Sequence, residues 1–310
     1  MEFQKKSRIL AYLAVLLLVS EFADAQHLGV GNHTPSFGTM TELVAVPVSV
    51  TDRNGHTIVG LRLEDFVITE NGVPQQVLSA SRWNVASSIG VVFDGSGSMK
   101  STVRTAQTAV RTLLNDNGPE DEAFLVRFAD TPQEVVDFTH DTDVIADKLL
   151  WDRPRGATAL FDAVFTGLSK IRRGANSRKA LVVVTDGGDN NSRYSFAELR
   201  ALARENDAQV YVVAIRRNFR DQDEQRGRLE LDQIANETGG RLLIVDNSGE
   251  LPHALATVNE LIRNQYLLTY RPTGLPRDGK WHALRVRIPP SSKIPSYRIY
   301  ARGGYFAPEQ

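Results

Sequence analysis

Hydrophobic and polar residues alternate with a period of two near both ends of the chain and follow a helical period between them. Alternation begins at Leu43, and Pro47 favours an edge position for this strand because proline donates no ladder hydrogen bond. Asn71-Gly72 predicts a tight hairpin turn. Four short strands are therefore expected in the first β segment: Leu43 to Val50, Ile58 to Leu63, Phe66 to Glu70 and Gln76 to Ala80.

After Trp83, apolar strands alternate with amphipathic helices, which is typical of a mostly parallel sheet covered on both faces. The uninterrupted apolar run Ala180 to Val184 predicts a central strand, and Gln133 to Phe138 predicts an antiparallel edge strand. Ser195 and Glu198 form a capping-box pattern. The other expected strands are Ile89 to Phe93, Ala123 to Phe128, Val210 to Ile215 and Leu242 to Val245. The other expected helices are Thr102 to Leu114, Val144 to Leu150, Ala159 to Ile171, Leu229 to Glu237 and Glu250 to Arg263.

Alternation returns at the C-terminal end, where Tyr266 to Tyr270, Trp281 to Ile288 and Tyr297 to Ala301 predict strands. Neither flanking β segment is long enough to bury a good core alone. We therefore expect an α/β fold with a doubly wound, mostly parallel sheet over residues 85–263. A small β-sandwich would be built jointly from residues 42–84 and 264–310.

The first residues have the pattern of an export signal. Lys5, Lys6 and Arg8 precede the apolar run Ile9 to Val19, and small residues follow before Gln26. Residues 1–25 are therefore interpreted as a cleaved signal peptide and residues 26–41 as a flexible leader. The expected location is periplasmic or secreted, with no stable membrane span after cleavage.

Composition narrows the classes of function. The 36 Lys and Arg nearly balance the 37 Asp and Glu, so net charge gives no reason to expect nucleic acid as a partner. The chain has no cysteine, which excludes disulfides, thiolate metal sites and a cysteine nucleophile. The six histidines are scattered without a helical pair suited to zinc.

Three segments bring oxygen-bearing side chains to the carboxyl edge of the predicted sheet. Asp94, Ser96 and Ser98 follow a buried strand, Thr158 opens a later helix, and Asp186 ends the most apolar strand. These five residues offer only hard oxygen atoms and two negative charges, a set that suits Mg²⁺, Mn²⁺ or Ca²⁺ better than zinc or copper. Asp189 and Asn190 are interpreted as loop surface outside the site.

The chain contains Asp-x-Ser-x-Ser, a later Gly-x-Thr and Thr-Asp-Gly, in this order. These motifs resemble the metal-ion-dependent adhesion site of von Willebrand factor type A domains, and the resemblance covers Ser87 to Arg263. The flanking β segments, with Gly303 to Pro308, resemble a related group of bacterial secreted proteins. The resemblance implies that Ser96 and Ser98 bind the ion directly and Thr158 directly or nearly so. It implies that Asp94 and Asp186 bind directly or through water. The remaining coordination position would accept a carboxylate from a partner protein.

Other functions are kept as alternatives. The five residues can instead cap helices and turns without binding an ion. The metal can serve only to stabilise a structural envelope component. A serine hydrolase using Ser96, or a metal-assisted phosphoryl-transfer enzyme using Asp94 and Asp186, has weaker support. Ser96 lacks a Gly-x-Ser-x-Gly elbow, the only late histidine of the α/β region is His253, and Lys100 lies outside a P-loop motif. A protein-binding, non-enzymatic module is therefore expected, with Mg²⁺ as the first choice of ion.

Overall fold

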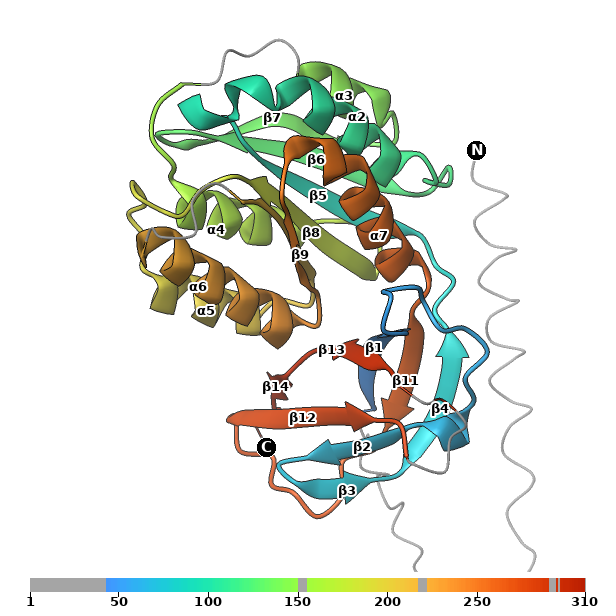
Figure 1. Ribbon diagram of the computed structural model, residues 1–310. Coiled ribbons are helices and arrows are strands. Elements are labelled where there is room, and N and C mark those ends of the chain that lie inside the picture. Colours follow the sequence, from blue (N-terminus) through green and yellow to red (C-terminus); the bar gives the residue numbers. More distant parts are fainter. Residues whose placement is uncertain (1–42, 150–154, 217–221, 290–293, 295, 310) are drawn as a thin grey trace, which may run out of the picture. The chain divides into compact units, whose positions relative to one another are not determined.

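The computed structural model describes residues 43–149, 155–216, 222–289, 294 and 296–309 (Figure 1). The predicted signal peptide and leader lie outside these residues, as does Leu150 at the end of one predicted helix. No helix in the described part of the chain is long and apolar enough to cross a membrane.

A six-stranded sheet in the order β10-β9-β8-β5-β6-β7 forms the centre of the α/β domain (Figure 1). Its neighbouring strands are parallel except for the pair β6 and β7. The predicted central strand is β8, between β5 and β9, and the predicted antiparallel edge strand is β7, so both predictions are confirmed. The strands are β5 (Ser87–Asp94), β6 (Glu122–Phe128), β7 (Pro132–Thr139), β8 (Arg178–Thr185), β9 (Gln209–Ile215) and β10 (Leu242–Val245).

Helices cover both faces of this sheet. The first face carries α2 (Val103–Leu114), α3 (Asp143–Lys148) and α7 (Leu251–Arg263). The second face carries α4 (Leu160–Ile171), α5 (Phe196–Arg204) and α6 (Gln222–Thr238). The capping box at the start of α5 is present, with Ser195 accepting from the N–H of Glu198. The predicted doubly wound α/β fold is therefore confirmed.

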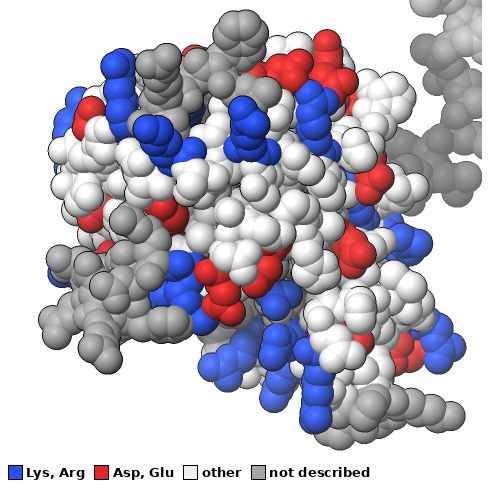
Figure 2. All heavy atoms as spheres, turned by 45° about the horizontal axis from the view of Figure 1, so that its top comes forward, with Lys and Arg blue, Asp and Glu red and all other residues white. Residues whose placement is uncertain are grey.

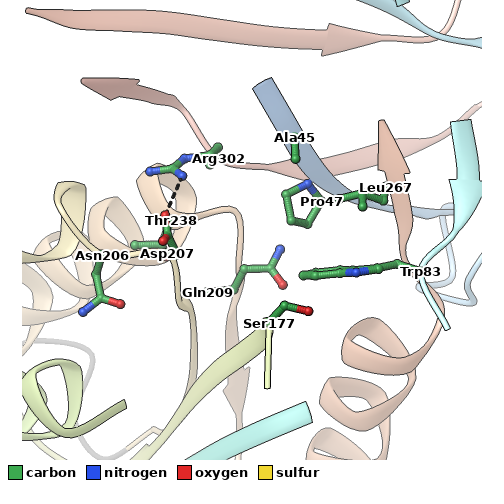
Figure 3. Close-up of a pocket in the computed structure, with 10 residues that line it drawn as sticks. All are labelled: Ala45, Pro47, Trp83, Ser177, Asn206, Asp207, Gln209, Thr238, Leu267 and Arg302. Carbon is green, nitrogen blue, oxygen red and sulfur yellow. Dashed lines mark hydrogen bonds and ion pairs between the residues drawn. The ribbon is translucent and has the colours of Figure 1, made fainter. Parts of the chain in front are cut away.

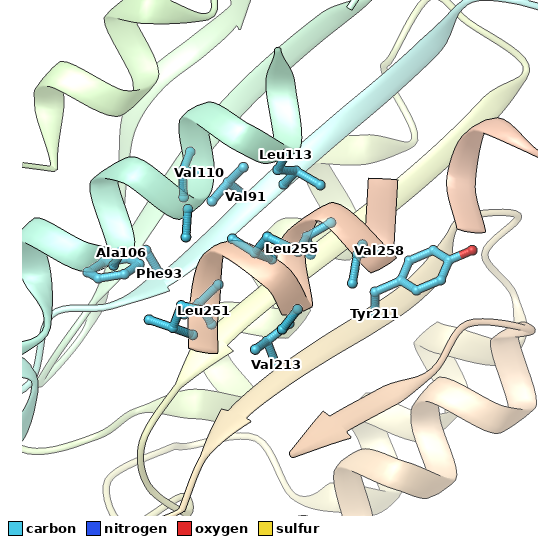
Figure 4. Packing of buried hydrophobic residues seen from close by; sticks show 14 of the residues in the cluster. Val91, Phe93, Ala106, Val110, Leu113, Tyr211, Val213, Leu251, Leu255 and Val258 are labelled. Carbon is cyan, nitrogen blue, oxygen red and sulfur yellow. The ribbon is translucent and has the colours of Figure 1, made fainter. Parts of the chain in front are cut away.

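Apolar side chains of α2 and α7 interlock over β5 and β9 (Figure 4). Leu113 of α2 and Leu255 of α7 are fully buried, as are Val91 of β5 and Val213 of β9. Burying one side chain of this size stabilises the fold by about 1.5–3 kcal/mol. The apolar residues of α2 and α7 recur at helical spacing because they face this contact with the sheet.

The two flanks form two four-stranded sheets with the orders β13-β1-β11-β4 and β14-β12-β2-β3. Each sheet combines strands from both flanks, and the apolar faces of the strands meet in one buried cluster that includes Val48, Ile68 and Leu268. The predicted joint packing of the flanks is confirmed. The strands are β1 (Val44–Thr51), β2 (Val67–Glu70), β3 (Val73–Gln75), β4 (Val77–Arg82), β11 (Tyr266–Tyr270), β12 (Trp281–Arg287), β13 (Arg298–Ala301) and β14 (Gly304–Phe306).

Three predictions about the first flank are wrong. The hairpin at Asn71-Gly72 joins β2 to β3, and the strand expected at Gln76 to Ala80 is β4, which lies in the other sheet. Ile58 to Leu63 is not a strand, because the hydroxyl of Tyr266 accepts from the N–H of Leu61 and donates to the carbonyl of Ile58, replacing ladder bonds. β1 is not an edge strand either, because it lies between β13 and β11. Pairing with β13 begins only at Val48, so Pro47 faces no strand on that side and its missing N–H costs no ladder bond.

Arg178 at the start of β8 contacts both segments in which the chain passes between the sandwich and the α/β domain. Its Nη1 donates to the carbonyl of Trp83 at 2.9 Å and, at 3.4 Å, to that of Ile262, while Nη2 donates to the carbonyl of Val85. Burial, together with the charge of Arg263, lowers the pKa of Arg178 to about 10. One buried guanidinium therefore holds the chain where it enters β5 and where it leaves α7.

Candidate metal centre

The loops that follow β5 and β8 lie side by side at the carboxyl edge of the sheet. The chain passes from β5 to its neighbour β6 and only later returns to β8 on the other side of β5. The winding direction therefore reverses between β5 and β8, the position where open α/β sheets bind ligands. Asp94 is the last residue of β5, and Asp186 directly follows β8.

Hydrogen bonds connect the loop after β5 with the loop after β8. Ser96 Oγ lies 2.9 Å from Ser98 Oγ. Ser98 Oγ donates to Asp186 Oδ1 at 2.7 Å. Asp94 Oδ1 accepts from the N–H of Ser96 at 2.9 Å. Four of the five residues predicted from the sequence thus belong to one hydrogen-bonded cluster.

Asp94 is fully buried, and its partners are hydroxyl and backbone donors rather than a basic side chain. Thr185 Oγ1 donates to Asp94 Oδ2 at 2.6 Å. Burial raises the pKa of Asp94 above its ordinary value, and the hydrogen bonds from Thr185 and Ser96 partly offset this rise. A buried carboxylate without a cationic partner is costly, and a bound cation at this position would remove the cost.

Thr158, the fifth predicted residue, lies in the segment that leads into α4, and it is 6% exposed. Its N–H donates to Asn190 Oδ1 at 2.8 Å, and the N–H of Asn190 donates to the Thr158 carbonyl at 3.0 Å. The N–H of Gly97 donates to the carbonyl of Gly156 at 3.4 Å. The Thr158 segment is therefore held against both loops through backbone hydrogen bonds.

Sequence analysis missed the residues that support the predicted ones. Asp189 and Asn190 do belong to a loop, but Asp189 Oδ1 also accepts from the N–H of Phe161 at 3.1 Å, in the first turn of α4. Asp130 Oδ1 accepts from the N–H of Ala157 at 2.7 Å. Thr185 holds Asp94, as described above. Their only sequence signal is a polar residue beside a motif, which is too common to identify a role.

The two glycines of the loop after β5 differ in what they contribute. The N–H of Gly95 donates to the carbonyl of Phe128 at 2.6 Å, and a Cβ at Gly95 would lie 3.2 Å from that oxygen. A Cβ at Gly97 would meet no atom closer than 3.9 Å. Neither glycine has a positive φ. Only Gly95 is needed, because another backbone approaches it closely.

The donor atoms fit a hard divalent cation. The hydroxyl of Ser98 lies within hydrogen-bond distance of both the Ser96 hydroxyl and the Asp186 carboxylate, and the buried carboxylate of Asp94 adds negative charge beside them. Mg²⁺, Mn²⁺ and Ca²⁺ prefer such oxygens. No group of three or more His, Cys, Asp or Glu side chains arranged for a metal occurs among the described residues, so any ion at this cluster would depend on the serine hydroxyls beside two carboxylates.

The geometry gives no support to a serine hydrolase. Ser96 Oγ is hydrogen-bonded to Ser98, not to a histidine, in the described part of the chain. His253, the candidate base, instead lines a hollow beside β10. The nucleophile and base required for acyl transfer are therefore not brought together.

A separate cavity of about 340 Å³ lies between the outer face of β1 and β11 and the α/β domain (Figure 3). Trp83, Pro47 and Leu267 line one side, and Gln209 and Thr238 line the other. Gln209 and Thr238 already hydrogen-bond to the carbonyls of Gly239 and Ile234. The cavity contains none of the five predicted residues and belongs to a different part of the molecule.

Figure 2 shows both signs of charge on one face, with several Lys and Arg side chains gathered in the lower centre of the view and Asp and Glu side chains above and beside them. This agrees with the near balance of 36 basic and 37 acidic residues.

Comparison with solved structures finds similar folds at low sequence identity. A von Willebrand factor type A protein from Catenulispora acidiphila has a TM-score of 0.52 and 14% identity over 87% of this chain and 64% of its own. The BatB protein from Bacteroides thetaiotaomicron has a TM-score of 0.46 and 18% identity, covering 57% of this chain and 98% of its own. The von Willebrand domain of the type V pilus tip protein Mfa5 from Porphyromonas gingivalis has a TM-score of 0.46 and 12% identity, covering 58% and 95%.

Among curated proteins there is no match. The model of the von Willebrand factor type A domain family, in contrast, matches residues 88–257, which is more than half of the chain and contains all five predicted site residues. The protein therefore belongs to the von Willebrand factor type A domain family.

Proposed function

We propose that this protein is an exported, non-enzymatic protein-binding module whose cluster of Asp94, Ser96, Ser98, Thr158 and Asp186 holds a divalent cation, with Mg²⁺ as the first choice. The observation that carries the proposal is the fully buried carboxylate of Asp94, which has no basic partner among the residues that the structure describes and lies behind the linked oxygens of Ser96, Ser98 and Asp186. A cation would complete this cluster electrostatically.

The bound ion would supply positive charge and a coordination position for an acidic partner. Serine and threonine hydroxyls are neutral ligands, so the negative charge around the ion comes from two aspartates alone. If one of them acts through water, the direct ligands do not fully compensate the charge of the divalent ion, and the ion can accept another anion. A carboxylate from an Asp or Glu of another protein would complete the shell. Ser96, Ser98 and Asp186 would orient the ion, while Thr185 would keep the Asp94 carboxylate in place.

Export rests on the basic and apolar pattern of residues 1–25, and it is consistent with the absence of cysteine. A periplasmic or secreted binding module of a bacterial envelope is the role that combines this signal with the family assignment. A structural envelope component with a fold-stabilising ion is the second candidate, favoured by the same buried Asp94.

Accessibility of the ion distinguishes the two candidates. Mn²⁺ bound to the purified protein should enhance water-proton relaxation, and an aspartate-containing peptide should reduce the enhancement by displacing the bound water. The matched peptide with asparagine in place of aspartate should have no effect. A bound Mn²⁺ whose relaxation effect is insensitive to the acidic peptide would favour the structural role and contradict the binding role.

A further inference from the structure

The two edges of the six-stranded sheet differ in how they are protected. β7 begins with Pro132, is interrupted by two register shifts, and carries the charged residues Glu134 and Asp137. These features discourage pairing with another strand. β10 has the sequence Leu-Leu-Ile-Val without proline or charge, and Ile244 is 45% exposed.

The outer side of β10 offers backbone hydrogen-bonding groups. β10 pairs in parallel with β9, and in the described part of the chain no strand pairs with its other side. In a strand, the N–H and C=O groups of alternate residues point to the same side. Leu243 and Val245 face the same helical layer as α7, whereas Leu242 packs with the layer of α6.

A hollow flanks β10 on each face of the sheet. The hollow on the α6 side measures about 440 Å³ and includes Leu229, which is 71% exposed, together with Ile244. The hollow on the α7 side measures about 470 Å³ and includes Ala254 and Thr257. Alternate side chains of a strand point to opposite faces of a sheet. The two hollows therefore lie where the side chains of one additional strand would fall.

The shape of this edge favours a single strand over a second copy of the chain. α6 and α7 line the hollows on the two faces of β10. Two copies pairing through β10 would bring four such helices together, each about 10 Å across, before their strands reached the spacing of about 4.8 Å. An extended peptide carries no covering helices and meets no such obstacle.

Charge at the first end of β10 adds a preference. Arg241 lines the hollow on the α7 side, and its guanidinium lies 5.4 Å from the ring centroid of Tyr300. Its Nη1 atom is buried without a hydrogen-bond partner among the described residues. At the opposite end, Glu250 also lines this hollow. An antiparallel strand would bring its C-terminal end to Arg241, where an acidic side chain would be complementary.

We propose that the outer edge of β10 binds one extended segment of a partner protein. The segment adds as a seventh strand antiparallel to β10, places apolar side chains beside Ile244 and Leu229, and pairs an acidic residue near its C-terminal end with Arg241. This is recognition by strand addition, in which backbone bonds supply affinity and alternate side chains supply specificity. The edge is separate from the candidate metal centre, so either proposal can fail alone.

The test is selection of a display library of linear nine-residue peptides on the purified protein. Enriched peptides should alternate apolar residues and carry Asp or Glu near the C-terminal end. Ile244→Pro removes an outward N–H from the edge strand and should weaken synthetic versions of these peptides at least tenfold. Arg241→Glu should change the selected residue to Lys or Arg. Asp94→Asn is the control and should leave peptide binding unchanged.

A second measurement does not depend on the folding of a variant. N-methylation of the peptide at alternate residues should abolish binding in one register and preserve it in the other, and the bound peptide should protect the N–H groups of Leu242 and Ile244 from hydrogen exchange. Failure to enrich peptides, or equal binding to Ile244→Pro, would overturn the proposal. Dimerisation that Ile244→Pro abolishes would also overturn it and assign the edge to a second copy.

Discussion

Gly156 has a backbone conformation that only glycine adopts readily, with φ of +87°, and a Cβ there would lie 2.5 Å from Asp130 Oδ2. Gly156→Ala should destabilise the protein by about 1–3 kcal/mol and weaken Mn²⁺ binding, because the Thr158 segment must move. Gly60 is the matched control, since its φ is +86° and a Cβ there meets no atom within 4 Å. Equal melting temperatures and equal Mn²⁺ affinities for the two variants would contradict this role of Gly156.

Glu237 on α6 binds two arginines of α5, accepting from Arg200 Nε at 2.8 Å and from Arg204 Nε at 2.8 Å. Although burial opposes ionisation, the hydrogen bonds from Arg200 and Arg204 prevail and lower the pKa of Glu237 to about 2. Its stabilising effect is therefore present above pH 4.5 and is lost as the pH falls toward 2.

Glu237→Gln should reduce the free energy of unfolding by about 1–2 kcal/mol at pH 7, after allowance for solvent screening of a partly exposed group. Urea unfolding at a series of pH values measures this difference, which should shrink steadily below pH 4.5. Glu64→Gln, at an exposed ion pair with Arg62, is the control. A difference that stays constant down to pH 3 would show that Glu237 acts through packing alone.

At the residue scale, sequence reasoning identified the side chains that converge but not those that support them. Asp94, Ser96, Ser98 and Asp186 follow buried strands, and parallel strands bring their carboxyl ends to one edge. Thr185 and Asn190 act through hydrogen bonds to residues far away in the sequence. No local pattern distinguishes such a residue from an ordinary polar residue of a turn.

Elements were predictable where their determinants are local. Asn71 and Gly72 have φ of 48° and 82°, which closes the predicted tight turn after β2, although the strand that follows it is β3 and not the predicted Gln76 to Ala80. The error at Ile58 to Leu63 has the opposite origin, because Tyr266, on a distant strand, satisfies that backbone. The short strands β3 and β14 were not predicted, since three residues carry almost no period.

Arg178 holds together the chain segment before β5 and the end of α7, where the chain passes between the two parts of the molecule. Arg178→Met should lower the free energy of unfolding by about 2–4 kcal/mol, because the carbonyls of Trp83 and Val85 lose a charged donor in a buried setting. Arg82→Met is the control, since Arg82 makes one side-chain hydrogen bond, to Asn264, at an exposed position. Urea denaturation measures the free energy of unfolding of both variants. Similar losses for the two variants would contradict the proposed role of Arg178 in holding these segments together.

At the scale of the whole molecule, the sandwich depends on strands from both flanks. β1 lies between β11 and β13, and β2 lies between β12 and β3. The alternation of each flank predicts strands but not their partners, so the joint sandwich followed from the argument that neither flank buries a core alone. The exact pairing, including the position of β1 inside its sheet, required the structure.

Truncation after Arg263 should make residues 43–82 sensitive to protease, because β1 loses both of its neighbours and β2 loses β12. Limited proteolysis followed by mass spectrometry locates the cleavages. The full chain, with its flank strands paired, is the control. Unchanged protease resistance of residues 43–82 would mean that this flank is stable without the C-terminal strands and would contradict a shared core.

Calorimetric titration of the purified protein with Mg²⁺ and Mn²⁺ is the decisive test of whether the cluster after β5 binds a divalent cation. Asp94→Asn and Ser96→Ala are the test variants, and Ser79→Ala, whose hydroxyl lies near Thr269 in the sandwich, is the control. We expect saturable binding to the protein and to the control, and loss of binding in both test variants while their thermal unfolding stays cooperative. Absence of binding at millimolar metal, or equal binding by Asp94→Asn, would contradict this expectation.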